Sequence, residues 1–465
     1  MLKRTFGVAS ASFMLASCNF APTYERPSTT LQDTFAVTDF APMSEARAAQ
    51  EVTWQVFFRD PALHQLISRA LERNQDFAAA VARIDQAKAL YRIQRSAQLP
   101  TVAVGVDATR ARIPNTPTGV ASVANQFGAQ VAVTAFELDF WGRVANLSES
   151  ARRNYLATAY GARAFRISLI ASVASTYYAI LAGDEGVALS MHTAQTREYA
   201  REIARLRLQA GATSLVDYEQ ADILATQAET QLAELRRTTA QLRNQLAVLV
   251  GGPLSPELAQ TQGIGNTEQF GPLDPGLPSA MLDRRPDIQA AEEALQAANA
   301  DIGAARANFF PRISLTTTFG YVSTELSNLF THGGQAWLLA GGASLPLWDW
   351  GARQAQLGFS EARRDELTAN YRKAIQVAFQ EVSDALIARQ RLREQINAQE
   401  RAVSAEARLA ETAELRYQNG ISIYLEVVDA QRSLFTAQQQ LILLRAAELQ
   451  NGATLYAALG GGQND

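Results

Sequence analysis

The stretch Leu206-Arg207-Leu208-Gln209-Ala210-Gly211 recurs as Leu415-Arg416-Tyr417-Gln418-Asn419-Gly420, 209 positions later in the chain. Downstream the same spacing pairs four more identical residues: Ala221 with Ala430, Ala228 with Ala437, Gln231 with Gln440 and Leu232 with Leu441. Upstream the spacing becomes 211 and pairs Asp76, Ala79, Ala80, Ala87, Arg95 and Pro100 with Asp287, Ala290, Ala291, Ala298, Arg306 and Pro311. Insertions and deletions in loops produce such a drift. The chain therefore contains an internal duplication, and each half must have the same structural role.

Long runs without proline surround both copies. None occurs from Thr118 to Gly252 or from Leu347 to Asp465. The second run carries apolar residues spaced mostly by three, four or seven: Leu367, Tyr371, Ile375, Ala378, Val382, Ala385, Leu392 and Ile396. This near-heptad seam indicates helices coiled against neighbours. A helix of about 60 residues is about 90 Å long, which favours a rod or tunnel over a solid bundle. A shorter helical pattern runs from Asp60 to Gln98 and begins at Pro61, a residue typical of helix starts.

Between the helical runs the apolar period changes to two, which predicts a β-hairpin in each half. In the first hairpin, at about 101–138, the alternating residues are Val102, Val104, Val106 and Ala108, then Phe127, Ala129, Val131, Val133 and Ala135. In the second, at about 312–347, they are Ile313, Leu315, Thr317, Phe319 and Tyr321, then Trp337, Leu339, Gly341, Ala343 and Leu345. A purely structural coiled protein needs no such segments.

Four strands of about ten residues are each long enough to cross a bilayer when tilted. Strands in lipid must close into a barrel, because an open edge leaves backbone groups unpaired. Eight strands from two chains give a barrel filled by its own side chains, so twelve strands from three chains are the smallest water-filled solution. Aromatic residues near the strand ends predict an interfacial girdle or packing where sheet meets helix: Phe136, Phe140, Trp141, Phe319, Tyr321, Trp337, Trp348 and Trp350.

Composition excludes several classes of protein. The chain has 42 Lys and Arg against 46 Asp and Glu, which gives no electrostatic footprint for nucleic acid. No run of 18 consecutive apolar residues appears, so a transmembrane helix is not expected. The three histidines are scattered, and no metalloprotease, nucleophile-elbow or phosphate-loop motif is present. We therefore predict no catalytic residues, no metal site and no cofactor other than a covalent lipid.

The N-terminus resembles a lipoprotein export signal. Lys3 and Arg4 precede a short apolar segment, which ends at Leu15-Ala16-Ser17-Cys18. The segment is too short to span a bilayer. Cys18 is the only cysteine, so no partner exists within the chain for a disulfide. The pattern predicts lipidation of Cys18 and a membrane anchor. By resemblance to lipoprotein sorting, Asn19 in the following position suits the outer membrane.

These patterns predict a division into six segments. Residues 1–17 form the signal peptide, and the Pro-, Ser- and Thr-containing segment 18–60 forms an extended tether. The first repeat spans 61–250 and the second 278–460. Between them, 251–277 reads as a connector with several prolines, and 461–465 forms a tail.

Several separate motifs resemble those of the TolC-like outer-membrane factors. Arg284-Arg285-Pro286-Asp287-Ile288 and the stretch from Ile302 to Pro311 resemble the family's second-repeat signature. Residues 137–143 and 345–351 resemble its paired strand-to-helix corners. Residues 22–27, 415–441 and 456–462 resemble the lipoprotein branch that serves multidrug efflux with pumps of the RND type (OprM-like, NodT-type). The resemblance covers essentially the whole mature chain.

The resemblance implies a mainly α fold with a membrane β-barrel. Three chains form a homotrimer, in which four strands per chain complete a twelve-stranded barrel in the outer membrane and a long α-helical tunnel continues into the periplasm. The implied function is a passive exit duct for drugs and other small toxic compounds. Its implied partners are a periplasmic adaptor (membrane fusion) protein, an inner-membrane RND pump and outer-membrane lipid. The same fold also serves metal-ion efflux and type I protein secretion, which remain alternatives.

The resemblance also assigns a gate near the periplasmic helix tips. Gly211 and Gly420 suit helix C-caps and would turn the two helical hairpins at those tips. In the segment from Leu425 to Arg432, the family match implies an acidic ring of Asp429 and an apolar constriction of Leu425. Tyr417 and Arg432 would form the links that hold the helices closed. In the first repeat Asp217 is the candidate, although the repeats differ here and its contribution is open.

Overall fold

The computed structural model describes residues 19–28, 47–48, 53–113, 122–254, 270, 273–274, 284–331 and 333–461. The chain divides into two compact units. The first is built from residues up to 28, 83–159 and 290–372, and the second from residues 29–82, 160–289 and 373 onwards. Each unit contains segments from both sequence repeats, as two interleaved halves require.

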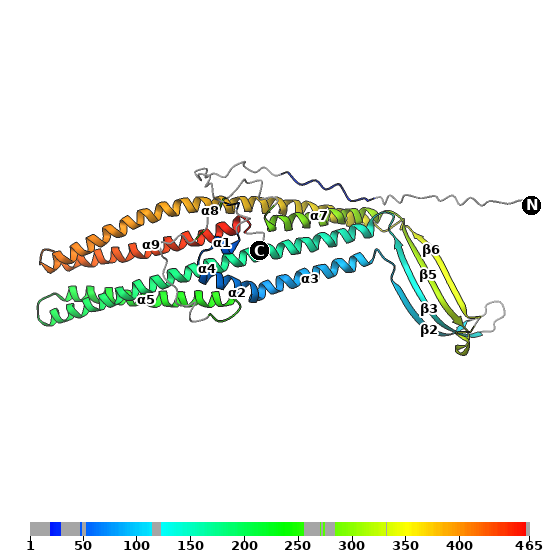
Figure 1. Ribbon diagram of the computed structural model, residues 1–465, viewed down its shortest axis with the longest axis horizontal. Helices are drawn as coiled ribbons and strands as arrows, with labels where there is room; N and C mark the ends of the chain where they lie inside the picture. The colour runs from blue at the N-terminus through cyan, green and yellow to red at the C-terminus, as the bar shows by residue number, and fades with distance from the viewer. Residues whose placement is uncertain are drawn as a thin grey trace, which may run out of the picture. The chain divides into compact units, whose positions relative to one another are not determined.

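The first unit contains a four-stranded antiparallel sheet in the order β2-β3-β5-β6 (Figure 1). The strands are β2 (Val102–Ile113), β3 (Ser122–Leu138), β5 (Arg312–Ser323) and β6 (Gln335–Ser344), and a short 3-10 turn, η2 (Leu326–Asn328), lies between β5 and β6. β3 is 17 residues long, well beyond the predicted ten. The two hairpins pair with each other through β3 and β5, so β2 and β6 are the edges of the sheet.

The strand register places apolar residues side by side on one face. Val104 pairs with Val131, Val131 with Phe319, and Phe319 with Trp337. The opposite face carries Asp107 and more polar or small residues. The pairing of β3 with β5 shifts between Val133 and Phe136, where Ala135 has φ +50. This one-residue bulge is a common device for bending a strand, and it interrupts the alternation that the sequence predicts through Ala135.

Residues 19–26 lie along α7 (Pro286–Ala307) in the first unit. Arg26 donates two hydrogen bonds to the Glu292 carboxylate at 3.0 and 2.8 Å. Asn299 Nδ2 donates to the Pro22 carbonyl at 2.7 Å. Close to the end of the helix, a Cβ on Gly303 would stand 2.7 Å from the Ala21 nitrogen. Glycine is therefore required for this close approach, and the contacts run the full length of the described N-terminal segment.

The two tryptophans at the strand-to-helix corners have different environments. Trp141 is half-buried, stacks on Phe310 at 5.0 Å and donates to the Pro311 carbonyl at 2.8 Å. Trp350 is 89% exposed and meets Trp348, itself 75% exposed, edge to face. Of the two alternatives that the sequence leaves open, Trp141 takes the packing role, and Trp350 has the exposure that a membrane girdle needs.

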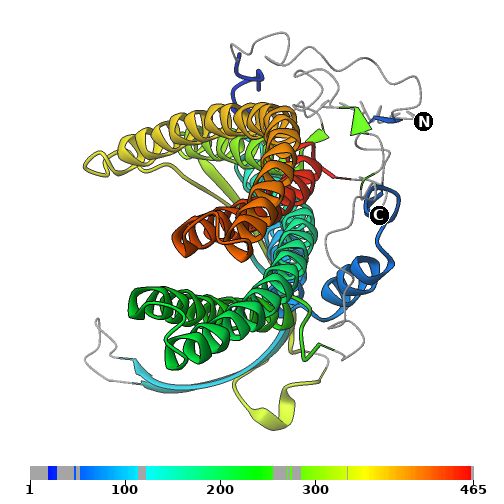
Figure 2. The ribbon, with the colours of Figure 1, turned by 90° about the vertical axis from the view of Figure 1, so that its left-hand side faces the viewer.

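The second unit is dominated by two helical hairpins, which lie side by side in Figures 1 and 2. The first joins α4 (Arg143–Gln209) to α5 (Leu215–Leu249), and the second joins α8 (Ala352–Gln418) to α9 (Tyr424–Ala458). α4 and α8 each contain 67 residues, or about 100 Å at 1.5 Å per residue. The equal helix lengths in the two halves follow from the sequence duplication.

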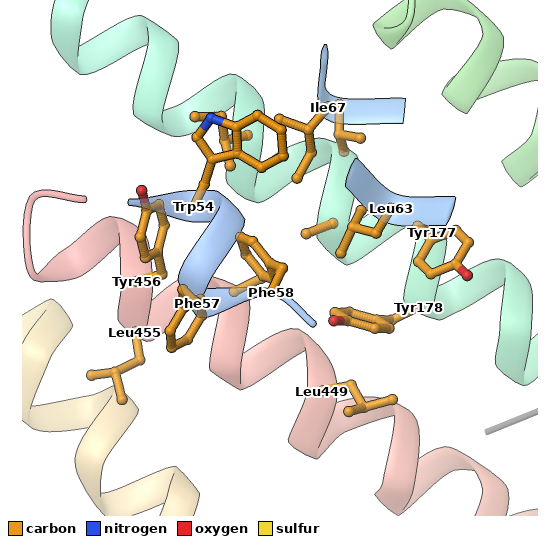
Figure 3. Packing of buried hydrophobic residues seen from close by; sticks show 14 of the residues in the cluster. Trp54, Phe57, Phe58, Leu63, Ile67, Tyr177, Tyr178, Leu449, Leu455 and Tyr456 are labelled. Atoms are coloured by element: carbon orange, nitrogen blue, oxygen red, sulfur yellow. The ribbon is translucent and has the colours of Figure 1, made fainter. Parts of the chain in front are cut away.

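A large hydrophobic cluster of the second unit is centred where α1 (Trp54–Phe57) and α2 (Pro61–Arg73) pack on the long helices (Figure 3). Phe57 stacks on Tyr456 at 5.1 Å. Asp60 caps α2 by accepting from the Ala62 nitrogen at 2.8 Å, and it also accepts from the Tyr177 hydroxyl at 2.6 Å. The second unit also contains a two-residue parallel pair, β1 (Arg47–Ala48) with β4 (Leu273–Asp274).

The helical pattern predicted from Asp60 to Gln98 forms two helices, α2 and α3 (Gln75–Ser96). The break falls at Asn74, which is 4% exposed. Its side chain accepts from the Phe77 nitrogen at 2.8 Å and donates to the Leu249 carbonyl at 3.0 Å. Asn74 therefore caps α3 and links it to the end of α5. The local periodicity of the sequence does not predict this contact.

Among the described helices, α4 alone includes an 18-residue window that is long and apolar enough to cross a membrane by length and composition. A search for unbroken apolar runs does not reveal this window, because polar residues interrupt it. Half of the window is buried in the protein. Core helices of soluble bundles are often equally long and apolar. The finding is therefore weak evidence for a membrane-spanning helix.

Candidate functional site

Both helical hairpins turn through the same backbone motif. The Gly211 nitrogen donates to the Leu208 carbonyl at 3.1 Å, and the Ala212 nitrogen to the Arg207 carbonyl at 2.8 Å. In the second hairpin, Gly420 and Ile421 make the equivalent bonds at 2.9 Å each. Gly211 has φ +68 and Gly420 has φ +71. These are Schellman motifs, in which glycine takes the left-handed position.

The helices that follow the two turns begin differently. Ser214 and Asp217 form a reciprocal capping box at the start of α5. The Asp217 carboxylate also accepts from the Thr213 hydroxyl at 2.8 Å. This hydrogen bond, with those from Ser214, lowers the pKa of Asp217 below its ordinary value. Ile423 occupies the equivalent position before α9 and provides no side-chain cap. The first-repeat turn is therefore the more strongly capped.

A cavity of about 160 Å³ lies between the hairpins close to the turns. Its lining includes Arg207, Asp217, Tyr417 and Tyr424. Arg207 donates to the Tyr417 hydroxyl at 3.2 Å, and its guanidinium lies 5.8 Å from the centroid of that ring. Tyr417 also contacts the Tyr424 ring at 5.2 Å. Tyr417 therefore links the second-repeat hairpin to the first through a cation–π contact and a hydrogen bond.

The remaining candidate gate residues lie on the first turns of α9. Arg432 Nη2 stands 2.9 Å from Asp429 Oδ1, an ion pair three residues apart on one helix. Both side chains are more than half exposed, and Leu425 is 42% exposed. The structure thus brings Asp429 together with Arg432, and Tyr417 together with Arg207. Among the residues that the structure describes, no hydrogen bond or cation–π contact joins Tyr417 to Arg432, and Asp217 makes its hydrogen bonds within its own turn.

Sequence reasoning did not identify two arginines of this region. Arg207 is repeated as Arg416 in the second half. Its partner Tyr417 aligns with Leu208 of the first half, and this difference between the repeats could have drawn attention to the pair. Arg197 is only 5% exposed. It donates to the Leu224 carbonyl on α5 at 3.3 Å and lies 5.2 Å from the Phe435 ring centroid on α9. Its Nη2 has no hydrogen-bond partner among the residues that the structure describes. Burial lowers the pKa of Arg197.

A larger cavity of about 540 Å³ lies beside Arg285, a residue of the quoted second-repeat motif. Arg285 is buried and binds Asp287 and Glu381, each at 2.7 Å, and the Ala458 carbonyl at 2.7 Å. Burial lowers the pKa of Arg285, but the bonds to Asp287 and Glu381 outweigh it and leave a net rise. These contacts hold the end of α9, which is a structural role.

Cys18 lies outside the described residues, as do the signal peptide at 1–17 and most of the connector and tail. Within the described part of the chain, no group of three or more His, Cys, Asp or Glu side chains is placed to hold a metal ion.

Comparison with known proteins gives close relatives of matching length. The toluene efflux pump outer membrane protein TtgC of Pseudomonas putida is 39% identical, with 99% of this chain and 96% of the relative aligned. The outer membrane protein OprJ of Pseudomonas aeruginosa is 35% identical over 100% and 98%. The open-state crystal structure of the MtrE outer membrane channel of Neisseria gonorrhoeae superposes with a TM-score of 0.86 at 34% identity, covering 96% and 98%.

The family description "Outer membrane efflux protein" matches residues 66–252 and 277–461. The two matched segments together cover most of the chain, and the relatives align over nearly their full length. The fold class predicted from sequence is confirmed by the solved channels. The chain belongs to the outer membrane efflux protein family, whose members are outer-membrane channels and not enzymes.

Proposed function

We propose that the protein is the passive exit duct of a tripartite efflux system and acts as a homotrimer. The observation that carries the proposal is the sheet, whose edge strands β2 and β6 have no partner among the described residues. An open edge in lipid is strongly unfavourable. Pairing β2 of one chain with β6 of the next, three times over, closes twelve strands around a lumen.

The two faces of the sheet support a position in the membrane. Val104, Phe319 and Trp337 on the apolar face are 78%, 54% and 75% exposed in the single chain, a pattern suited to lipid. Asp107 and Gln130 lie on the other face, as expected for a polar lumen. The exposed Trp348 and Trp350 near the helical end of the sheet would then lie at the inner interface of the outer membrane.

The relatives suggest the cargo and the partners. Their names describe outer membrane components of toluene, solvent and antibiotic efflux pumps. We infer that small apolar organic compounds and drugs pass through this chain as well, supplied by an inner-membrane RND pump through a periplasmic adaptor. The duct supplies no chemistry of its own.

The N-terminal segment supports lipidation of Cys18. Asn19, the next residue, accepts from Asn146 Nδ2 at the start of α4 at 2.9 Å, and Phe20 stacks on Phe310 at 4.5 Å. Both contacts lie where the strands meet the helices. Acyl chains on Cys18 would therefore enter the membrane beside the barrel. The proposed division remains a signal at 1–17, a tether at 18–60, repeats at 61–250 and 278–460, a connector at 251–277 and a tail at 461–465.

We also propose that the hairpin turns form the periplasmic gate. Gly211 and Gly420 mark the tips, and the exposed Asp429 and Leu425 would face the threefold axis when three chains assemble. Three carboxylates close together repel one another, and each Arg432 reduces that repulsion within its own chain. The pair Arg207–Tyr417 would hold the two hairpins of one chain together, and Asp217 would keep the first turn rigid.

Two experiments test the duct itself. The mature protein, purified in detergent, should have the mass of three chains in light scattering, and a stable soluble single chain would contradict the proposal. Deleting the gene should increase susceptibility to a panel of solvents, dyes and antibiotics. Complementation with the wild-type gene should reverse the effect. An unchanged panel in a strain lacking related channels would exclude drug efflux.

The gate has its own test. Asp429→Ala leaves Arg432 without its ion-pair partner, so three uncompensated guanidinium groups would repel one another near the axis. We therefore expect a looser closed state and a higher single-channel conductance in planar bilayers. Asp222→Ala is the control, because Asp222 is a partly exposed helical carboxylate that is also paired with an arginine, Arg201 at 3.2 Å. Equal conductance of Asp429→Ala and the wild type would remove Asp429 from the gate.

A further inference from the structure

Two arginines stand at the hairpin end of β2 on the apolar face of the sheet. The pairing of β2 with β3 runs without a register shift from Val102 to Ile113, so alternate residues share one face throughout. Arg110 and Arg112 therefore lie on the same face as Val102, Val104 and Val106. Both are exposed. Neither guanidinium has a hydrogen bond or ion pair within the described part of the chain.

An aromatic level separates these arginines from the apolar stripe. Phe127 pairs with both Ala108 and Ser323, and Tyr321 pairs with Ala129 on the same face. Tyr321 also meets Phe330 edge to face at 5.5 Å. Moving along β2, the face is apolar from Val102 to Ala108 over about 20 Å, and then cationic at Arg110 and Arg112. Aromatic residues followed by polar ones mark the level of lipid headgroups.

The charge on this part of the sheet is uncompensated. Among the described strand residues, the carboxylates are Asp107, which lies on the opposite face, and Glu137, which binds Arg143 at the helical end. In the β5–β6 turn, Glu325 accepts from Asn328 at 2.8 Å. Arg110 and Arg112, whose Cα atoms lie about 7 Å apart along the strand, are thus available for an external anion.

We propose that Arg110 and Arg112 bind the phosphorylated headgroup of an outer-leaflet lipid. The inference rests on the proposed function, because it requires the sheet to span the outer membrane with the hairpin end outside. Arginine presents a planar fork that matches phosphate oxygens through two parallel hydrogen bonds. The acyl chains of the lipid would lie along the stripe of Val102, Val104 and Val106. Three chains would provide three such sites around the barrel.

The test measures retention of lipid A, a lipid with two phosphates, by native mass spectrometry of the assembled protein in detergent. Wild-type protein should retain lipid A, and Arg110→Gln with Arg112→Gln should reduce its affinity about tenfold or more through lost charge-assisted hydrogen bonds. Arg312→Gln is the matched control, because Arg312 is an exposed arginine of the same sheet at its helical end, bonded to Asn308. This control should retain lipid A as the wild type does.

Three further arms separate the possible outcomes. Dephosphorylated lipid should bind weakly and equally to all variants, and inorganic phosphate alone should not raise the melting temperature. Arg110→Lys with Arg112→Lys keeps the charge and should retain an intermediate amount, so the proposal remains testable if the glutamine variant fails to assemble. Equal retention in all variants, equal binding of both lipids, or stabilisation by free phosphate would overturn the inference. A wild-type protein that never assembles in membranes would instead overturn the proposed function.

Discussion

Single residues determine the two hairpin turns. Gly211 and Gly420 adopt left-handed backbone angles, and a Cβ added at either position would meet nothing within 4 Å. The cost of a side chain is therefore backbone strain alone, about 1–2 kcal/mol for alanine. We expect Gly211→Ala and Gly420→Ala to increase hydrogen exchange at the turns. Asparagine, which tolerates this conformation better, should increase it less. Identical exchange in alanine and asparagine variants would contradict the strain argument.

A second prediction at the scale of single residues concerns Asp217. Hydrogen bonds from Thr213 and Ser214 depress its pKa in the folded protein. The stabilisation is therefore present above the unfolded pKa of about 4 and is lost as the pH falls through the folded value. Asp217→Asn should loosen the first turn of α5 by about 1 kcal/mol at neutral pH, measured as faster exchange there. The difference from wild type should shrink at acid pH. A pH-independent difference would exclude the carboxylate as its source.

The glycines of both turns were predictable from sequence because the repeat places them in equivalent positions. The partners of the site residues were not. Arg207 and Tyr417 are separated by 210 positions, and only the packing of one hairpin against the other brings them together. Arg197 shows the same limit, because an arginine in a long polar helix is normally solvated. Its burial depends on α5 and α9 rather than on its neighbours in sequence.

At the scale of elements, two buried arginines, Arg197 and Arg285, can be compared because their partners differ. Arg197 has one carbonyl bond, an aromatic contact and an unsatisfied Nη2. Arg285 binds two carboxylates and the last turn of α9. Replacing a poorly paired buried charge with an apolar residue is often neutral or stabilising. We expect Arg197→Met to keep or raise the melting temperature, and Arg285→Met to destabilise by about 2 kcal/mol. Thermal unfolding followed by circular dichroism measures both, and equal losses would contradict this expectation.

Elements with strong periodicity were predictable, and their interruptions were not. The proline-free runs account for the four long helices, and the change of period after Pro100 and Pro311 accounts for the strands. The break at Asn74 depends on its bond to Leu249, far along the chain. The bulge near Ala135 depends on pairing with β5, where the Ala135 nitrogen donates to Thr316 Oγ1 at 3.1 Å. Both features arise from contacts between segments.

At the scale of the whole molecule, the interleaved repeats determine how many edges of the sheet one chain can pair by itself. Each repeat contributes one strand hairpin and one helical hairpin, and β3 with β5 joins the two strand hairpins into a single sheet. The duplication therefore removes two of the four edges that separate hairpins would expose. It leaves β2 and β6, which have no strand partner among the described residues and which a second chain would pair in the proposed trimer. In the proposed trimer, closure of the sheet and assembly of the oligomer would be the same event.

A barrel closed in the membrane predicts that the two faces of β5 differ strongly in their tolerance of an arginine. Phe319 lies on the apolar face opposite Val131 and Trp337, and its neighbour Thr318 lies on the polar face. Arginine on a lipid-facing side near the membrane centre costs about 2–4 kcal/mol per chain, whereas a lumen-facing arginine remains in water. Phe319→Arg should therefore reduce the amount of assembled oligomer in outer membranes, and Thr318→Arg should leave it nearly unchanged while altering conductance. Semi-native gel electrophoresis of membrane fractions measures the oligomer. Equal assembly of the two variants would show that the apolar face does not contact lipid, and the barrel model would have to be abandoned.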